Sequence, residues 1–448
     1  MITIDLKDEE SLPKVTMAVY IEKPTAFLEE FFHKINALLY PRSKVNLYVH
    51  NNVEFHDKMV SGWIETVKSD YASVKYVTRD ENVKEWHARN SAIDYCIEND
   101  CQYYFSIDSE AHLDNPYSLK LLIEQNRDVI APLLIRPYKA WSNFWGAITN
   151  DGFYARSLDY MEIVQAQRRG LWNVPYITSS YLLKRSLLDK EDTRPSYIKN
   201  LLDPDMAFCE NLREKGVFMY VSNRLDFGHL VNSEKFDPTR LNGELWEVFE
   251  NRWDWELRYL HTNYSNAVSP NTTLEAPCPD VFWFPLFTER YAKEMIETFE
   301  HYGTWSDGSH NPLYRGGPMQ VAIQSIGMGA VWQEILQNYV VPMQMKIYIG
   351  YDHYPPRAIM SFMVRYKPDE QPFLKPHHDT STYTINVGLN RPGIDFQGGG
   401  CRFVRYNCSV TNTRVGWVLM HPGRLTHLHE GLYVTGGTRY IIVTFIDP

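Results

Sequence analysis

Two kinds of apolar pattern alternate along the first half of the chain. Short runs of consecutive apolar residues predict buried strands, and segments with an apolar residue every three or four positions predict amphipathic helices. We predict strands at residues 14–21, 44–50, 73–77 and 102–107, and helices at about 25–39, 56–71 and 83–97. A βαβαβαβ order of this kind implies a parallel, Rossmann-like α/β sheet with helices on both of its faces.

A different pattern begins near residue 276, where several prolines punctuate the chain. One amphipathic helix is predicted at about 289–302, and beyond Met345 the apolar residues come in short runs at turn-sized intervals. These runs predict strands at 358–366, 383–389, 401–406, 416–420 and 439–445. Such spacing is typical of a double-sheet jelly roll, the double-stranded β-helix of the cupin kind. We therefore predict an α/β domain over residues 1–270 and a β domain over residues 271–448.

The composition indicates a globular protein of more than one domain and does not indicate a particular activity. A chain of 448 residues is too long for one ordinary core, and its 44% hydrophobic and 22% charged residues are typical of globular proteins. A net charge of −10 without a Lys/Arg-rich run argues against nucleic-acid binding. The longest apolar runs are too short to predict a transmembrane helix. The first residues of the chain lack the basic and apolar regions of a signal peptide.

The predicted β domain contains a candidate metal site. His377 and Asp379 are separated by one residue, so in a strand they lie on the same face and can bind one ion together. With the distant His429 they form the 2-His-1-carboxylate pattern of non-haem iron(II) oxygenases. Arg439 follows in the last predicted strand, where a planar guanidinium can grip a carboxylate of 2-oxoglutarate. A catalytic zinc site is the alternative, but zinc needs no such arginine.

Each of these residues also has an ordinary structural explanation. Asp379 can cap the end of a strand, and Arg439 can pair with a surface carboxylate. The joint pattern favours a functional site, because the ordinary explanations would have to hold together at four positions. The glycine run at 398–400 allows either a close approach of the backbone or a flexible hairpin turn. Three further histidines are predicted to be surface or hydrogen-bonded residues: His378, His421 and His427.

The α/β domain offers a weaker candidate site. No GxGxxG motif follows its first strand, which argues against a dinucleotide site. Its fourth strand ends in Asp108-Ser109-Glu110, and an acidic cluster at the carboxyl end of a parallel strand is where nucleotide-sugar transferases hold a divalent metal. His229 is a candidate further ligand. The alternative is a solvated turn at the end of the strand, and the sequence leaves both interpretations open.

Long motifs in both predicted domains resemble the procollagen lysyl hydroxylases, and the likeness covers essentially the whole chain. In the β domain it is carried by 365–371, 376–379, 384–387, 398–403, 421–427, 429–431, 437–440 and 447–448. In the α/β domain it is carried by 141–146, 172–176 and 203–209, which are similar to the central accessory domain of that family. The resemblance implies a Rossmann-like, glycosyltransferase-A-like accessory domain followed by a double-stranded β-helix dioxygenase domain.

The resemblance also implies roles for individual residues. His377, Asp379 and His429 are expected to hold iron(II), and Arg439 is expected to bind 2-oxoglutarate. Tyr366 and Asn386 match family positions that contact the co-substrate. The implied reaction is hydroxylation of lysine at C5 in collagen-like X-Lys-Gly sequences. It is coupled to oxidative decarboxylation of 2-oxoglutarate to succinate and CO₂, and L-ascorbate restores ferrous iron.

Further expectations follow from the same resemblance. The family implies disulfide bonds Cys96–Cys101 and Cys278–Cys408, with Cys209 and Cys401 free. It implies a homodimer formed through the C-terminal domain, with Leu432 in the contact, and a location in the lumen of the endoplasmic reticulum. Glycosylation sequons begin at Asn263, Asn271 and Asn407.

The chain departs from the family in two respects. On this resemblance, the given residues are expected to correspond to the accessory and dioxygenase domains, without the signal peptide and glycosyltransferase domain with which full-length members begin, and the stretch 315–328 differs from the usual sequence near the active site. A prolyl or other protein hydroxylase, a nucleotide-sugar transferase and a catalytically silent partner subunit are the alternative functions.

Overall fold

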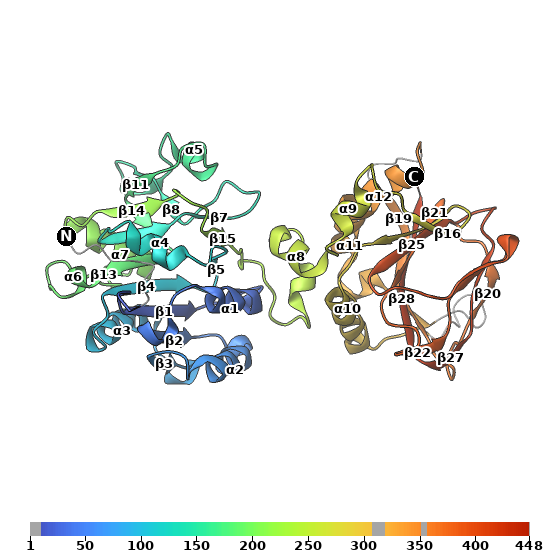
Figure 1. The fold of residues 1–448 in the computed structure, drawn as a ribbon, viewed down its shortest axis with the longest axis horizontal. Helices are drawn as coiled ribbons and strands as arrows, with labels where there is room; N and C mark the ends of the chain where they lie inside the picture. Colours follow the sequence, from blue (N-terminus) through green and yellow to red (C-terminus); the bar gives the residue numbers. More distant parts are fainter. Residues whose placement is uncertain (1–9, 307–318, 351–355, 448) are drawn as a thin grey trace. The chain divides into compact units, whose positions relative to one another are not determined.

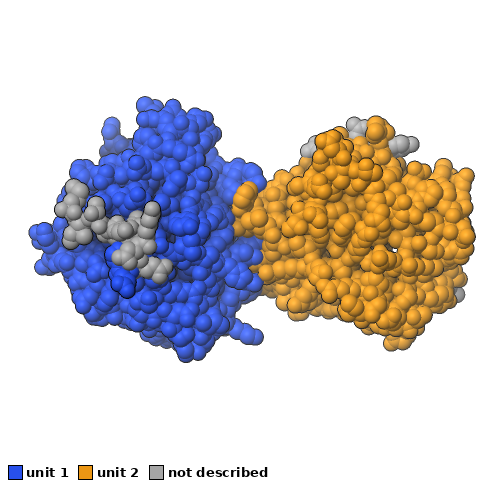
Figure 2. All heavy atoms as spheres, viewed as in Figure 1, with its two compact units in different colours: residues 1–238 blue, residues 239–448 orange. Residues whose placement is uncertain are grey.

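The computed structural model describes residues 10–306, 319–350 and 356–447, and the chain forms two compact units, residues 1–238 and 239–448 (Figure 2). Part of the predicted variable stretch, 315–318, lies outside the described residues. The units divide earlier than the boundary after residue 270 that the sequence suggested. The physical reason is that residues 239–270 pack with the second unit: Trp255 stacks on Tyr339, and Tyr264 Oη donates to the Tyr339 carbonyl oxygen at 2.8 Å.

Unit 1 is built on an eight-stranded sheet with the strand order β11-β14-β6-β13-β4-β1-β2-β3 (Figure 1). Its first four strands in the chain are β1 (Val15–Ile21), β2 (Val45–Asn51), β3 (Ser73–Val77) and β4 (Tyr103–Asp108). The others are β6 (Val129–Pro132), β11 (Leu171–Val174), β13 (Ser180–Lys184) and β14 (Met219–Ser222). The predicted parallel arrangement holds for β1 to β4. The whole sheet is mixed, because β13 runs antiparallel to β4 and β6 and β11 runs antiparallel to β14.

Helices cover both faces of this sheet, as the continuous apolar strands require. Alternate residues of β1 enter different cores: Met17 and Val19 pack on one face, and Ala18 and Tyr20 pack on the other. The first core also contains the apolar faces of α1 (Leu28–Ala37), α2 (Asp57–Val67) and α4 (Ser118–Glu124). The second core contains those of α3 (Glu85–Glu98) and α7 (Pro204–Glu214).

Unit 2 is a double-stranded β-helix (Figure 1). Its larger sheet has the order β16-β17-β25-β21-β28-β19-β18, with every pairing antiparallel. These strands are β16 (Glu275–Cys278), β17 (Val281–Pro285), β18 (Met319–Ala322), β19 (Arg357–Tyr366), β21 (Tyr383–Gly388), β25 (Trp417–Pro422) and β28 (Arg439–Asp447). The smaller sheet has the order β20-β26-β23-β24, formed by β20 (Leu374–His377), β26 (His429–Gly431), β23 (Cys401–Phe403) and β24 (Cys408–Val410).

Helices of unit 2 pack on its larger sheet. The predicted helix is α10 (Glu289–Tyr302), and α8 (Arg252–Tyr259), α9 (Tyr264–Val268), α11 (Gly329–Ile335) and α12 (Val341–Ile347) accompany it. Trp332 of α11 donates its indole hydrogen to the Thr444 hydroxyl of β28 at 2.9 Å. The inner face of the larger sheet instead carries an apolar cluster that includes Phe362, Val364 and Ile441. This cluster forms one wall of the space between the two sheets.

The expected disulfide bonds are both present. Cys96 and Cys101 join the end of α3 to the segment before β4, and Cys278 and Cys408 join β16 of the larger sheet to β24 of the smaller one. Cys209 and Cys401 are the free cysteines of the described residues. Among the described helices, none is both long and apolar enough to cross a membrane.

Candidate metal and co-substrate site

The two histidines of the predicted metal site occupy one rung of the smaller sheet. His377 is the last residue of β20, His429 is the first residue of β26, and the two are direct cross-strand partners. Their ring centroids lie 4.4 Å apart. An antiparallel pairing therefore brings together two side chains that are far apart in the sequence.

The carboxylate of the predicted site lies just beyond the end of β20. Asp379 Oδ1 is 3.4 Å from His377 Nε2, and Asp379 Oδ2 is 3.7 Å from His429 Nε2. The ligand atoms of all three residues lie within 4.8 Å of one another. Asp379 Oδ2 also accepts a hydrogen bond of 2.6 Å from the Thr384 hydroxyl of β21. The larger sheet therefore fixes the orientation of this carboxylate.

The backbone fixes which ring nitrogens face the site. His377 Nδ1 lies 2.8 Å from the Lys375 carbonyl oxygen, and His429 Nδ1 lies 2.9 Å from the His427 carbonyl oxygen. Because a carbonyl oxygen only accepts, each Nδ1 carries the hydrogen and each neutral ring presents its Nε2 lone pair. These lone pairs face the oxygens of Asp379. A cation between them removes the repulsion, so the three residues fit a bound metal ion.

Burial and mutual contact set the protonation of these ligands. Burial alone would raise the pKa of Asp379, but the nearby imidazoles of His377 and His429 lower this pKa to about 2. Burial lowers the pKa of His429 to about 3. Burial alone would lower the pKa of His377, but the Asp379 carboxylate and the Lys375 carbonyl oxygen together raise this pKa. An ionised carboxylate beside a neutral imidazole is the form that binds a metal ion.

Arg439, the predicted co-substrate ligand, begins β28 directly opposite Tyr366, the last residue of β19. Its side chain is buried, with 5% of the residue exposed, and the guanidinium lies 5.6 Å from the centroid of the Tyr366 ring. One Nη1 hydrogen bond of 3.2 Å goes to the Gly400 carbonyl oxygen, whereas Nε has no hydrogen-bond partner among the described residues. A buried guanidinium with an unused donor fits the carboxylate of a small anionic ligand.

A cavity of about 470 Å³ connects the metal ligands to Arg439. Its walls include the three metal ligands, Tyr366, Asn386 and Arg439, together with apolar side chains of β19 and β28. Asn386 Nδ2 lies 3.1 Å from Nε2 of the buried His421. The structure thus brings all six predicted site residues to one cavity. Of the histidines predicted to be ordinary, His378 is exposed, and His421 and His427 are buried and hydrogen-bonded.

The glycine run beside Arg439 serves a close approach of the backbone. A Cβ on Gly399 would lie 3.1 Å from Arg439 Cδ, and a Cβ on Gly400 would lie 2.6 Å from the Val410 carbonyl oxygen. Both glycines also have positive φ angles, 72° and 120°. Of the two interpretations of this run, the geometry favours the close approach.

The structure does not bring the weaker candidate residues of unit 1 to a common point. Asp108 Oδ1 accepts from the buried Arg89 at 2.8 Å, and Glu110 pairs with Lys23 at 3.0 Å. His229 Nδ1 instead lies 2.7 Å from Asp114 Oδ2. No metal-ligand group among the described residues contains Asp108 or Glu110.

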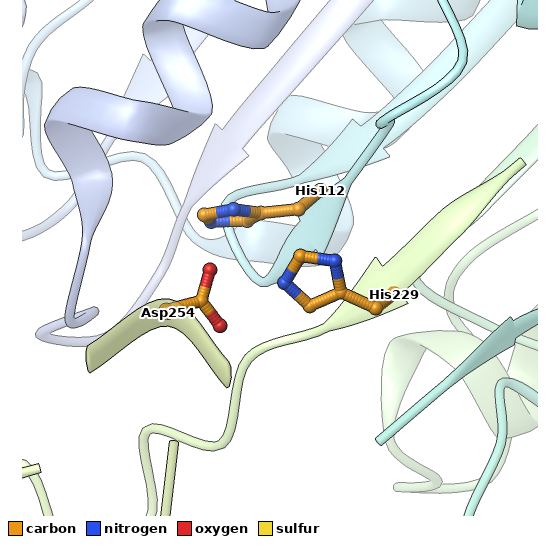
Figure 3. A group of neighbouring side chains, drawn as sticks. All are labelled: His112, His229 and Asp254. Carbon is orange, nitrogen blue, oxygen red and sulfur yellow. The ribbon is translucent and has the colours of Figure 1, made fainter. Parts of the chain in front are cut away.

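No motif in the sequence pointed to the neighbour that His229 has in the structure. Its strand β15 (Gly228–Leu230) pairs with β5 (Ala111–His112), which places the ring centroids of His112 and His229 at 5.2 Å (Figure 3). This contact depends on the pairing of two very short strands, which no local sequence pattern predicts. The third residue labelled in Figure 3, Asp254, belongs to unit 2.

Comparisons with known proteins agree with both domain types. The family model "Glycosyltransferase family 25, N-terminal domain" matches residues 12–242, and "2OG-Fe(II) oxygenase superfamily" matches residues 357–448. The predicted fold classes of both domains are thereby confirmed. The second match contains all six candidate residues, and iron(II) and 2-oxoglutarate are the cofactors of that superfamily.

The chain also has close relatives along its whole length. It is 47% identical over 454 residues to procollagen-lysine,2-oxoglutarate 5-dioxygenase 2 of Mus musculus. It is 48% identical over 448 residues to procollagen-lysine,2-oxoglutarate 5-dioxygenase 1 of Gallus gallus. These alignments cover 100% and 98% of this chain but 61% of each relative. The chain therefore spans about three fifths of the length of these relatives.

Proposed function

Because this chain belongs to the family of procollagen-lysine 5-dioxygenases, we propose that it hydroxylates lysine at C5 in collagen-like X-Lys-Gly sequences. The same cycle decarboxylates 2-oxoglutarate to succinate and CO₂. One observation carries the proposal. The Nε2 atoms of His377 and His429 converge on Asp379 in the same cavity that holds the buried Arg439.

Each residue of the cavity has a distinct task in this proposal. His377, Asp379 and His429 hold iron(II), which when bound supplies the activation of O₂. Arg439 binds the distal carboxylate of 2-oxoglutarate through parallel charge-assisted hydrogen bonds. Two further residues line the path between these groups and contact the co-substrate: Tyr366 and Asn386.

The walls of the cavity suit both the reaction and a lysine side chain. Met360, Phe362 and Phe445 line it beside the metal ligands. Apolar walls pack against the methylene groups of lysine and exclude water, which protects a reactive oxidising site from side reactions. L-Ascorbate is the proposed external reductant that returns the iron to the ferrous state after uncoupled turnover.

Partners and location complete the proposal. The macromolecular substrate is procollagen or a collagen-like peptide, and the chain works as a homodimer through its C-terminal unit, with Leu432 in the contact. Beside Leu432 the chain exposes Tyr433, which is 57% accessible. A location in the lumen of the endoplasmic reticulum is supported by the two disulfide bonds, which persist in oxidising compartments. Three exposed sequon asparagines also suit that compartment: Asn263, Asn271 and Asn407.

Succinate release tests the proposal directly. Wild-type protein is supplied with iron(II), 2-oxoglutarate, ascorbate and a collagen-like Lys-Gly peptide, with a Pro-Gly peptide in parallel. We expect release stimulated by the Lys-Gly peptide, a mass gain of one oxygen on its lysine, and loss of both in Asp379→Ala. Asp369→Ala, which removes an exposed carboxylate outside the cavity, is the matched control and should retain activity.

The two peptides separate the possible failures. Oxygen gain on the Pro-Gly peptide alone would identify a prolyl hydroxylase with the same site. An absence of release by iron-loaded wild type with either peptide would reject a hydroxylase acting on such sequences.

A further inference from the structure

Two neighbouring cross-strand pairs of β19 and β28 place their side chains on opposite faces of the larger sheet. Tyr366 pairs with Arg439, and the adjacent rung pairs Arg365 with Tyr440. Because successive side chains of a strand point to opposite faces, the first pair faces the cavity and the second faces away from it. Only Tyr366 and Arg439 of these four residues line the cavity.

The outward-facing rung is the centre of a dense polar network. Arg365 Nη1 donates to both carboxylate oxygens of Glu300 at 3.1 Å, and its Nη2 and Nε donate to Glu370 at 3.0 and 3.1 Å. The guanidinium also lies 4.5 Å from the centroid of the Trp305 ring. Its side chain is only 10% exposed. We call Glu300, Trp305, Arg365, Glu370 and Tyr440 the outer clamp.

Helix α10 itself does not favour a carboxylate at the position of Glu300. It lies in the last turn of α10, which ends at Tyr302 and is followed by Gly303 in the left-handed conformation. A carboxylate there faces the negative end of the helix dipole, which is mildly unfavourable. Glu300 is stabilised instead by Arg365 and by the Tyr440 hydroxyl, which donates to it at 2.6 Å. The stabilising contacts of the Glu300 carboxylate are therefore with strands β19 and β28 of the sheet and not with its own helix.

We propose that the outer clamp positions the co-substrate grip formed by Tyr366 and Arg439. Tyr366 is the last residue of β19 and Arg439 is the first of β28, so the grip sits where both strands end. Strand ends have few neighbours to hold them. On the cavity side, Arg439 donates to one carbonyl oxygen and contacts the Tyr366 ring. The clamp fixes the same backbone from the other face, one residue away on each strand.

The inference rests on the proposed function and extends it to residues outside the cavity. Glu300, Arg365 and Tyr440 are positioning residues, because they act through the backbone of Tyr366 and Arg439. Parallel hydrogen bonds to a carboxylate depend on donors held in a fixed geometry, so a small displacement of Arg439 weakens its contact with the co-substrate. Loosening of the clamp should therefore weaken 2-oxoglutarate binding and leave the metal ligands and the peptide path intact.

Two variants test the clamp, and a third on the same helix is the control. Tyr440→Phe removes one hydroxyl, and Glu300→Gln removes the shared charge. Glu297→Gln makes the same change one turn earlier, where the carboxylate pairs with the exposed Lys293 at 3.8 Å. We expect the KM for 2-oxoglutarate to rise about tenfold in Glu300→Gln and less in Tyr440→Phe. The KM for peptide and kcat at saturating 2-oxoglutarate should stay within about twofold, and Glu297→Gln should match wild type.

A binding measurement without turnover accompanies the kinetics. The rise in melting temperature caused by 2-oxoglutarate with Mn²⁺, in the absence of peptide, should be smaller in both clamp variants. If they melt earlier but keep the wild-type KM and the wild-type response to 2-oxoglutarate, the clamp only docks α10 and the inference is rejected. If Glu300→Gln does not fold, the KM and the melting response of Tyr440→Phe alone test the inference. Failure of wild type itself to respond to 2-oxoglutarate would reject the proposed function instead.

Discussion

Removal of the Thr384 hydroxyl is expected to weaken metal binding without touching a ligand. Thr384 Oγ1 donates to Asp379 Oδ2 at 2.6 Å, and the residue is buried with 1% exposed. Thr384→Val keeps the shape of the side chain, so the sheet should retain its packing. The substitution removes a short hydrogen bond to an ionised carboxylate, which is stronger than a bond between neutral groups, and also the 2.7 Å contact with the Ser381 hydroxyl.

The expected loss of metal affinity can be estimated from the position of this hydrogen bond. Partners that orient a metal ligand contribute about 10-fold to 100-fold in metal affinity, or about 1.4 to 2.7 kcal/mol. The Thr384 bond is also one of the interactions that lower the pKa of Asp379, so its loss should raise that pKa. A carboxylate that is both less well oriented and more easily protonated binds a cation less tightly. We therefore expect the dissociation constant for iron(II) to rise within this range.

Anaerobic titration with iron(II), followed by the quenching of tryptophan fluorescence, measures this affinity. Thr382→Val is the matched control: its hydroxyl, two residues earlier, donates to Asp447 at 2.9 Å and makes no bond to Asp379. Equal affinities of Thr384→Val and Thr382→Val, both within twofold of wild type, would refute the reasoning. They would mean either that Asp379 is not a ligand or that its orientation does not depend on β21.

Three further predictions concern the grip, the covalent link between the sheets and the pH dependence of unit 1. Arg439→Met should raise the KM for 2-oxoglutarate about 100-fold, the equivalent of two lost charged hydrogen bonds worth about 3 kcal/mol, and an unchanged KM in a 2-oxoglutarate titration would contradict that role. The Cys278–Cys408 bond spans 130 residues, so the double serine variant should lose about 5 kcal/mol of unfolding free energy in urea, and an unchanged midpoint would contradict this. Burial lowers the pKa of His56 from 6.5 to about 4, so the unfolded chain takes up the proton first and stability should fall between these pH values. The loss is at most about 3 kcal/mol, and His56→Gln should remove it from urea midpoints compared at pH 7.5 and 4.5.

The sequence predicted those parts of the fold that depend on local pattern. Strands β1 to β4, the helices between them and α10 coincide with apolar runs or helical periodicity, and the structure has them at nearly the same residues. Strands β11 and β13 were not among the predicted strands, and their antiparallel direction could not have been predicted, because apolar periodicity is the same in a parallel and an antiparallel strand. The division between the units was missed for a similar reason. The local pattern of residues 239–270 does not say on which unit they pack.

The candidate site also has residues that the sequence predicted and residues that it could not predict. His377, Asp379, His429 and Arg439 could be proposed because their residue types and order form a recognisable composite. The residues that support them give no such signal. Arg365 reaches Glu300 across 65 positions of the chain, and Tyr440 reaches the same carboxylate across 140. Contacts at that distance follow from strand pairing and helix docking, so only the folded structure could reveal them.

The candidate iron site depends on both layers of unit 2. His377 and His429 belong to the smaller sheet, whereas Asp379 is oriented by Thr384 of the larger one. The three ligands lie in or directly after the smaller sheet, but the carboxylate has this hydrogen bond only once the larger sheet is in place, so we expect a partly folded chain to hold the ion weakly. We therefore expect iron loading to follow the assembly of the two sheets, in contrast to zinc fingers, which fold around their metal. A cell short of iron should accumulate a folded but idle protein, and measuring how much of the chain is present would not reveal the deficit.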